Sequence, residues 1–201
     1  MTNSSKYIAC IVISIFSISY SYAQDKAPII NYYSTPDTLN FDATRYRLAW
    51  SSHPNEYYYK HEYLLENETF DHITKMILLE FLKGDFNLHD VVANKIYTLR
   101  QRKQTDKICN YEVIKSRDGK EYIIDFIISG SEDGKLNIVE WDCYRYKLHT
   151  DSAGHMGVLL LGVSYRGFGD DSMLFLKSLP EKRKIARQKM MQFEIPNIQI
   201  E

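Results

Sequence analysis

The chain has 201 residues, of which 44% are hydrophobic and 25% are charged, and its formal net charge at pH 7 is −1. A chain of this size can bury the core of one globular domain, whereas two domains would each be small. A net charge so close to zero does not favour nucleic acid or an anionic membrane surface as a partner.

The first 23 residues match the layout of a secretory signal peptide. Lys6 precedes an apolar segment at residues 8–22, and Ser21 and Ala23 are small residues where a signal peptidase reads the chain. The segment is shorter than the roughly 20 residues of a transmembrane helix. We therefore expect a signal peptide at residues 1–23, a periplasmic or secreted protein, and no membrane anchor after cleavage.

The segment after the signal peptide has no sustained periodicity. Residues 24–43 contain Pro28 and Pro36 among polar side chains, which predicts an extended lead-in. The folded part is then expected to be a single α+β domain at residues 44–201.

Two strands are predicted at the start of this domain. In residues 45–50 and 57–65, large aromatic or apolar side chains occupy every second position, as in half-buried strands. A hairpin with a four-residue loop at residues 52–55 would place Trp50 opposite Tyr57, with both apolar faces on one side.

Helical spacing follows the hairpin. Apolar residues recur at intervals of three and four from Phe70 to Phe81, after an N-cap at Thr69 and before a stop at Gly84. A second helix is predicted after Asn87. Cations near its end suit the helix dipole, and these are Arg100, Arg102 and Lys103.

The clearest strand signal comes next, because Asp-Gly turns separate three alternating segments. We predict an antiparallel meander, then a fourth strand covered on both faces, with the segments 109–115, 122–129, 136–148 and 157–165. A capping box at residues 178–181, with Pro180 in the first turn, predicts a final helix to Gln192.

These elements give the order β-β-α-α-β-β-β-β-α. Two hairpin-rich runs of strands, with helices between and after them, are typical of an α+β fold. We therefore predict a mostly antiparallel sheet, built from a hairpin and a meander, that is covered by helices.

Two cysteines remain after signal cleavage, and an oxidising compartment favours a disulfide between them. Two-residue turns in the meander would place Cys109 beside Ile128 and Cys143 beside Ile124, on one face but two strands apart. That separation is about 9.5 Å, and a disulfide needs Cα atoms within about 7 Å. The strand register therefore favours two buried thiols, with the disulfide as the alternative.

Motifs of metal or cofactor chemistry do not emerge from the sequence. The six histidines form no H-E-x-x-H motif, and no C-x-x-C pair or calcium loop is present. We predict no metal site, no cofactor and no catalytic residue, a core position for His61, and a polar loop at residues 151–155. The meander places four carboxylates on one face, which we interpret as solvated, namely Glu112, Asp125, Glu140 and Asp142.

The sixteen tyrosines gather most densely around the first hairpin. Tyrosine builds sheets, but it also offers amphipathic contact area for sugars, peptides and proteins. Outward-facing aromatic and charged side chains on this hairpin predict a site for an unknown protein or small ligand, formed by Trp50, His53, Tyr58, Lys60 and Glu62.

Residues 48–54 (LAWSSHP) and 58–63 (YYKHEY) resemble small, uncharacterised exported proteins of Gram-negative bacteria. This resemblance implies no known activity. The order of elements is also similar to that of the PsbP-like fold, whose members are often non-enzymatic accessory proteins, so it implies an accessory role by analogy alone.

The sequence thus predicts an exported, soluble, non-catalytic domain that binds through its first hairpin. The alternative is a small exported hydrolase, in which His155 or His53 would act with Asp125, Glu140 or Asp142.

Overall fold

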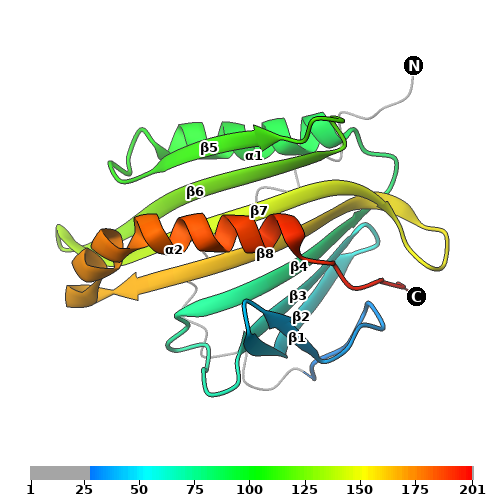
Figure 1. The fold of residues 1–201 in the computed structure, drawn as a ribbon, viewed down its shortest axis with the longest axis horizontal. Helices are drawn as coiled ribbons and strands as arrows, with labels where there is room; N and C mark the ends of the chain where they lie inside the picture. Colours follow the sequence, from blue (N-terminus) through cyan, green and yellow to red (C-terminus); the bar gives the residue numbers. More distant parts are fainter. Residues whose placement is uncertain (1–27, 201) are drawn as a thin grey trace.

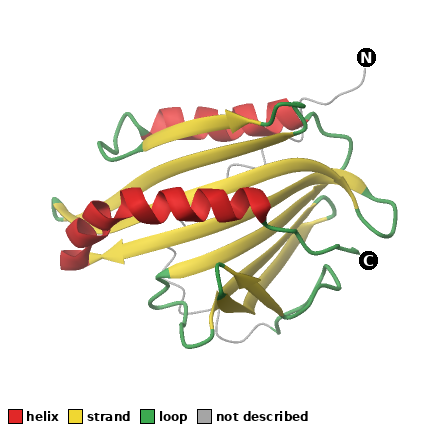
Figure 2. Ribbon diagram, viewed as in Figure 1, coloured by secondary structure: helices red, strands yellow, loops and turns green. Residues whose placement is uncertain are grey.

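The computed structural model describes residues 28–200, so the predicted signal peptide lies outside the described residues (Figure 1). It shows one eight-stranded antiparallel sheet with two long helices, one on each face (Figures 1 and 2). The α+β class is therefore confirmed, although the sheet dominates over the helices. The strand order across the sheet is β1-β2-β3-β4-β8-β7-β6-β5.

The elements have the following bounds. The strands are β1 (Thr38–Phe41), β2 (Thr44–Asn55), β3 (Tyr58–Leu65), β4 (Lys75–Lys83), β5 (Asn110–Lys115), β6 (Glu121–Glu132), β7 (Lys135–Thr150) and β8 (Met156–Phe168). The helices are α1 (Leu88–Arg102) and α2 (Ser172–Gln192), and a short 3-10 turn, η4 (Gly169–Asp171), precedes α2. None of the described helices is long and apolar enough to span a membrane.

The predicted order of elements is only partly correct. The helix expected from Thr69 to Phe81 is wrong, because residues 75–83 form β4 between β3 and β8. Residues 76–81 of this strand are buried on both faces, and a run that is apolar on all sides matches the helical and the strand period equally. A further strand, β1, forms inside the segment expected as an extended lead-in.

The predicted register of the first hairpin is also wrong. Trp50 lies opposite Glu62 rather than Tyr57, because β2 continues to Asn55 with two register shifts on the way. β1 pairs with β2 only as far as Arg47, so the outer edge of β2 beyond it meets no described strand. Pro54, which lacks a backbone N–H, can occupy such an edge without breaking a ladder.

The meander and the fourth strand are confirmed, but one bulge changes which side chains of the meander share a face of the sheet. Between β6 and β7 the register shifts at Gly130 and Ser131, so Cys143 pairs with Asp125 rather than Ile124. Cys109 therefore points to the α1 side and Cys143 to the α2 side, and the expectation of a shared face is wrong. Both thiols are free and buried, as favoured.

The same bulge divides the predicted acidic row. Asp125 and Glu112 contact arginines of α2, whereas Glu140 and Asp142 lie on the α1 side. Asp125 and Asp142 are fully buried, so the interpretation as a solvated face is wrong.

The final helix begins earlier than predicted. Phe175 and Leu179 are buried in the core beneath α2, which packs on β7 and β8. Because this burial extends the helix back to Ser172, Pro180 lies inside α2 rather than in its first turn. Gly167 allows the approach, since a Cβ there would lie 2.5 Å from the Phe175 side chain.

Candidate binding site

The sheet face on the α1 side carries a group of charged side chains, which we name the charged cluster. Adjacent strands bring them together, because Lys60 pairs with Glu80 across β3 and β4, and Glu140 pairs with Arg166 across β7 and β8. The cluster consists of Lys60, Glu62, Glu80, Lys95, Glu140, Asp142 and Arg166.

Two parts of the charged cluster are paired. The Lys60 ammonium lies 2.8 Å from a Glu62 carboxylate oxygen and 3.9 Å from a Glu80 oxygen. Burial alone would lower the pKa of Lys60, but Glu62 and then Glu80 raise it above its ordinary value. The Arg166 guanidinium donates to Glu140 in the same manner. These cations are therefore held in the charged form.

Asp142 is different, because it is fully buried and neither of its carboxylate oxygens accepts a hydrogen bond from a donor group of the described residues. Its close neighbour is the Glu140 carboxyl, which can share a proton with Asp142 but offers no donor when both are ionised. The hydroxyl of Ser164, the cross-strand neighbour of Asp142, likewise has no hydrogen-bond partner among the described residues. One Glu80 oxygen also accepts no hydrogen bond, although the Lys60 ammonium lies 3.9 Å from it. Burial, and then the charge of Glu140, raises the pKa of Asp142 well above its ordinary value. Buried polar groups without partners oppose folding, so this region lowers the free energy of unfolding.

Lys95 projects from α1 toward the same region. Its ammonium lies 4.4 Å from the centre of the Phe126 ring and 4.9 Å from that of Tyr144, which are cation–π distances. Burial lowers the pKa of Lys95, and the carboxylates of Asp142 and Glu80 oppose this shift. With Lys95 the cluster has three cations against four carboxylates, so its formal charge is −1 when all are ionised.

The structure places most of the predicted site residues beside this cluster. Lys60 and Glu62 belong to it, and the Lys60 ammonium lies 5.7 Å from the Trp50 ring centre. Tyr58 shares their strand face, at a spacing of two residues. His53 lies on the other side, where its ring stacks on Tyr59 at 3.9 Å.

The prediction took this face of the hairpin to be open to solvent, whereas the side chains of Lys60 and Glu62 are each 15% exposed. The sequence reasoning missed Glu80, Lys95, Ser164 and Arg166. Glu80 carried a usable signal, because a carboxylate inside the apolar run of residues 76–82 has to face a buried site.

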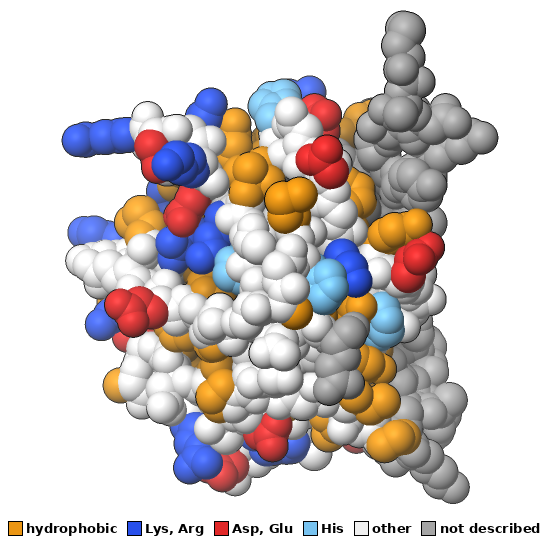
Figure 3. Space-filling view, turned by 90° about the vertical axis from the view of Figure 1, so that its right-hand side faces the viewer, with side chains coloured by type: hydrophobic (Ala, Val, Ile, Leu, Met, Phe, Trp, Pro, Cys, Tyr) orange, Lys and Arg blue, Asp and Glu red, His pale blue; other side chains and the backbone are white. Residues whose placement is uncertain are grey.

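The histidines of the hydrolase alternative have other neighbours. His155 Nδ1 lies 3.1 Å from Asp151, whose carboxylate also accepts backbone N–H groups of Ala153, His155 and Ile200. His53 Nδ1 lies 3.1 Å from the Tyr58 carbonyl. Figure 3 shows histidine side chains scattered over one end of the molecule. Neither histidine has a contact with Asp125, Glu140 or Asp142 in the described part of the chain.

Two sequence interpretations of polar residues are confirmed. His61 is fully buried, and the loop at residues 151–155 is a polar turn held by Asp151. Within residues 28–200, no group of three or more His, Cys, Asp or Glu side chains is arranged to hold a metal ion.

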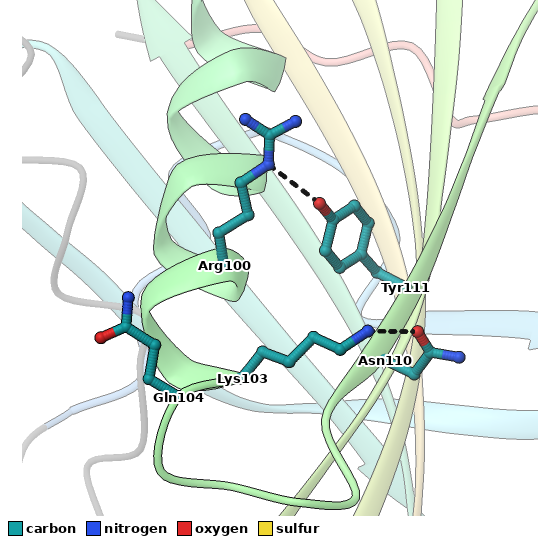
Figure 4. A pocket seen from close by; sticks show the side chains of 5 residues that line it. All are labelled: Arg100, Lys103, Gln104, Asn110 and Tyr111. Carbon is teal, nitrogen blue, oxygen red and sulfur yellow. Dashed lines mark hydrogen bonds between the residues drawn. The ribbon is translucent and has the colours of Figure 1, made fainter.

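A surface pocket of about 410 Å³ lies between the end of α1 and β5 (Figure 4). Arg100 donates to the Tyr111 hydroxyl at 3.0 Å, and the Lys103 ammonium donates to Asn110 Oδ1 at 3.2 Å. Gln104 completes the lining. The pocket is separate from the charged cluster, and basic and amide side chains line most of it.

Comparison with known proteins adds one finding. A model of an uncharacterised protein family matches residues 33–195, which is most of the chain and includes every described strand and helix. No curated protein and no solved structure matches the chain.

Proposed function

The chain belongs to the uncharacterised family whose model matches it, and we propose that it is an exported, non-catalytic domain that binds a cationic group of a small ligand or partner protein. The binding face is the charged cluster together with Trp50 and Tyr58 of the first hairpin. The observation that carries the proposal is the fully buried Asp142 carboxylate, which accepts no hydrogen bond from a donor group of the described residues.

The charge balance of the cluster favours a cation. Lys60 and Arg166 already have carboxylate partners, and the Lys95 ammonium lies over the Phe126 and Tyr144 rings. The two Asp142 oxygens and the Ser164 hydroxyl accept no hydrogen bond from the described residues. Once Asp142 is ionised, the cluster has one carboxylate in excess of its cations, and a single positive group beside Asp142 would neutralise it and donate to these oxygens. Lys60 and Glu62 retain some solvent exposure, so the cluster reaches the surface along β3.

The predicted signal peptide supports an extracytoplasmic setting for this binding. The layout of residues 1–23 motivates export. The histidine contacts described above give no support to the hydrolase, so we advance binding alone.

The test uses a simple amine as the probe. We expect n-butylammonium chloride to raise the thermal midpoint of the chain in a saturable manner, and sodium butyrate at equal ionic strength to leave it unchanged. Binding should tighten from pH 5 to pH 8, because the amine pairs with the ionised Asp142 and the folded chain holds its proton to unusually high pH.

Asp142→Asn should abolish the response to the amine, and it should not do so by unfolding the chain. Removing an unpaired buried charge should stabilise the fold by roughly 1–3 kcal/mol in urea titrations, and this gain should be larger at pH 8 than at pH 5. Glu112→Gln, on the opposite face, is the control and should keep the response. An equal response to butyrate, or an unaltered response in the Asp142→Asn variant, would refute the proposal.

A further inference from the structure

One edge of the sheet is open and long enough to accept another strand. β5 is the last strand of the order and pairs only with β6, through six residues. At the other edge β1 has only four residues. The part of β2 beyond Arg47 is contacted by the segment before β1, since Leu48 N–H donates to the Asp37 carbonyl and Ile30 N–H donates to the Ser51 hydroxyl. Most of β5 is exposed, including the apolar side chain of Val113, which is 38% exposed.

The register shows which backbone groups of β5 face outward. The N–H of Ser116 donates to the Glu121 carbonyl at 3.0 Å, next to the turn that joins β5 to β6. Hydrogen-bonded and non-hydrogen-bonded pairs alternate along an antiparallel ladder. The N–H and C=O groups that point away from β6 are therefore those of Tyr111, Val113 and Lys115.

The surroundings of this edge are basic, although the chain as a whole is not. Residues 100–120 contain seven Lys or Arg and three Asp or Glu, a formal charge of +4, against −1 for all 201 residues. The three carboxylates have internal partners, since Asp106 pairs with Arg102, Glu112 with two arginines of α2, and Asp118 with the Ser116 hydroxyl.

The basic pocket adjoins the open edge directly. Arg100 and Lys103 reach from α1 toward Tyr111 and Asn110 at the start of β5, as Figure 4 shows. Their hydrogen bonds go to a hydroxyl and an amide oxygen and not to a carboxylate, so both side chains have spare N–H donors for an anion.

We propose that β5 and the adjacent pocket bind an extended acidic peptide of a partner protein by strand addition. The outward N–H and C=O groups of Tyr111, Val113 and Lys115 continue the ladder, and the peptide backbone supplies the complementary groups. A carboxylate side chain of the peptide enters the pocket and pairs with Arg100 and Lys103. This site is independent of the charged cluster.

The test titrates the chain with a fluorescent nine-residue peptide in which Glu and Asp alternate with Val and Thr. Saturable binding is expected, and a matched peptide with Lys and Arg in place of the acids should bind at least tenfold more weakly. Val113→Pro removes an outward N–H without touching the β5–β6 ladder, and it should weaken binding about tenfold. Val113→Thr keeps this N–H and should bind like the native chain.

The charge variants test the pocket separately. Arg100→Gln with Lys103→Gln should weaken acidic-peptide binding several-fold and reduce its dependence on salt, whereas Lys177→Gln with Lys184→Gln on exposed positions of α2 should not. The proposal is overturned if neither peptide binds, if Val113→Pro binds as tightly as Val113→Thr, or if Val113→Pro instead abolishes self-association, which would identify a second copy as the occupant.

Discussion

At the scale of single residues, His61 shows how burial fixes a protonation state. Its ring is fully buried, and Nε2 accepts the backbone N–H of Tyr32 at 3.0 Å while Nδ1 lies 3.2 Å from the Tyr63 hydroxyl. Burial lowers the pKa of His61 to about 4. A protonated ring would carry an N–H at Nε2, which would face the backbone N–H of Tyr32. The neutral ring is therefore required for this contact between the segment before β1 and β3.

This shift predicts a specific loss of stability in acid. The folded pKa lies below the ordinary value of about 6.5, so the contribution of His61 is complete above pH 6.5 and is lost as the pH falls toward 4. The loss should reach about 3 kcal/mol. Urea titrations of the native chain between pH 4 and pH 7 measure it. His61→Gln should flatten this part of the profile and exposed His89→Gln should not; equal slopes in all three chains would contradict the assignment.

At the scale of elements, the sequence predicted best where local signals were unambiguous. Asn87 caps α1 as expected, with its side chain accepting the N–H groups of His89 and Asp90. β4 could not be told from a helix, because its burial on both faces comes from neighbours distant in the chain. The bulge at Gly130 had a local signal that the prediction did not use, because a glycine inside a strand often marks a bulge. This bulge decides which face Asp142 occupies. The prediction therefore placed Lys60 and Glu62 on one face of β3 and interpreted Glu140 and Asp142 as a solvated row. It missed Glu80 on β4, which pairs with Lys60, and Arg166 on β8, which pairs with Glu140.

At Pro180 the low helix propensity of proline conflicts with the packing of α2 on the sheet. A proline inside a helix removes one backbone hydrogen bond and crowds the carbonyl four residues earlier, yet α2 continues because Phe175 and Leu179 are buried beneath it. Pro180→Ala should therefore stabilise the chain by about 1–3 kcal/mol, read as a higher urea midpoint. Pro196→Ala, beyond the helix, serves as the control, and a destabilised Pro180→Ala chain would show that the proline is needed for the path of α2.

At the scale of the whole molecule, the two sheet faces differ in how their buried carboxylates are hydrogen-bonded. On the α2 face, Asp125 is fully buried but accepts from Trp141 Nε1 and Arg183 Nε, both at 2.7 Å. Arg145 holds the end of α2 by donating to the carbonyls of Met190 and Phe193. On the α1 face, Asp142 instead accepts no hydrogen bond from a donor group of the described residues. Buried charges without partners are enriched at functional sites, which is why the binding proposal concerns Asp142 on the α1 side.

The structural role of the α2 face can be measured directly. Arg183→Met leaves the buried Asp125 carboxylate with Trp141 and with Arg187, whose Nε lies 3.4 Å away. The chain should lose about 2–3 kcal/mol of unfolding free energy, because an under-paired buried charge remains. Unfolding in urea, followed by far-UV circular dichroism, measures this loss. Lys184→Met changes an exposed lysine of the same helix and should stay within about 0.5 kcal/mol of the native chain.

A double-mutant cycle distinguishes an ion pair from simple packing. Asp125→Asn removes the charge and keeps an oxygen that can accept from Trp141, so adding Arg183→Met to it should cost little. The loss of unfolding free energy in the double variant should therefore be smaller than the sum of the two single losses, by about 1 kcal/mol or more. Strict additivity would mean that Arg183 stabilises α2 through its aliphatic stem, and the contrast between a paired and an unpaired face would then lose its main support.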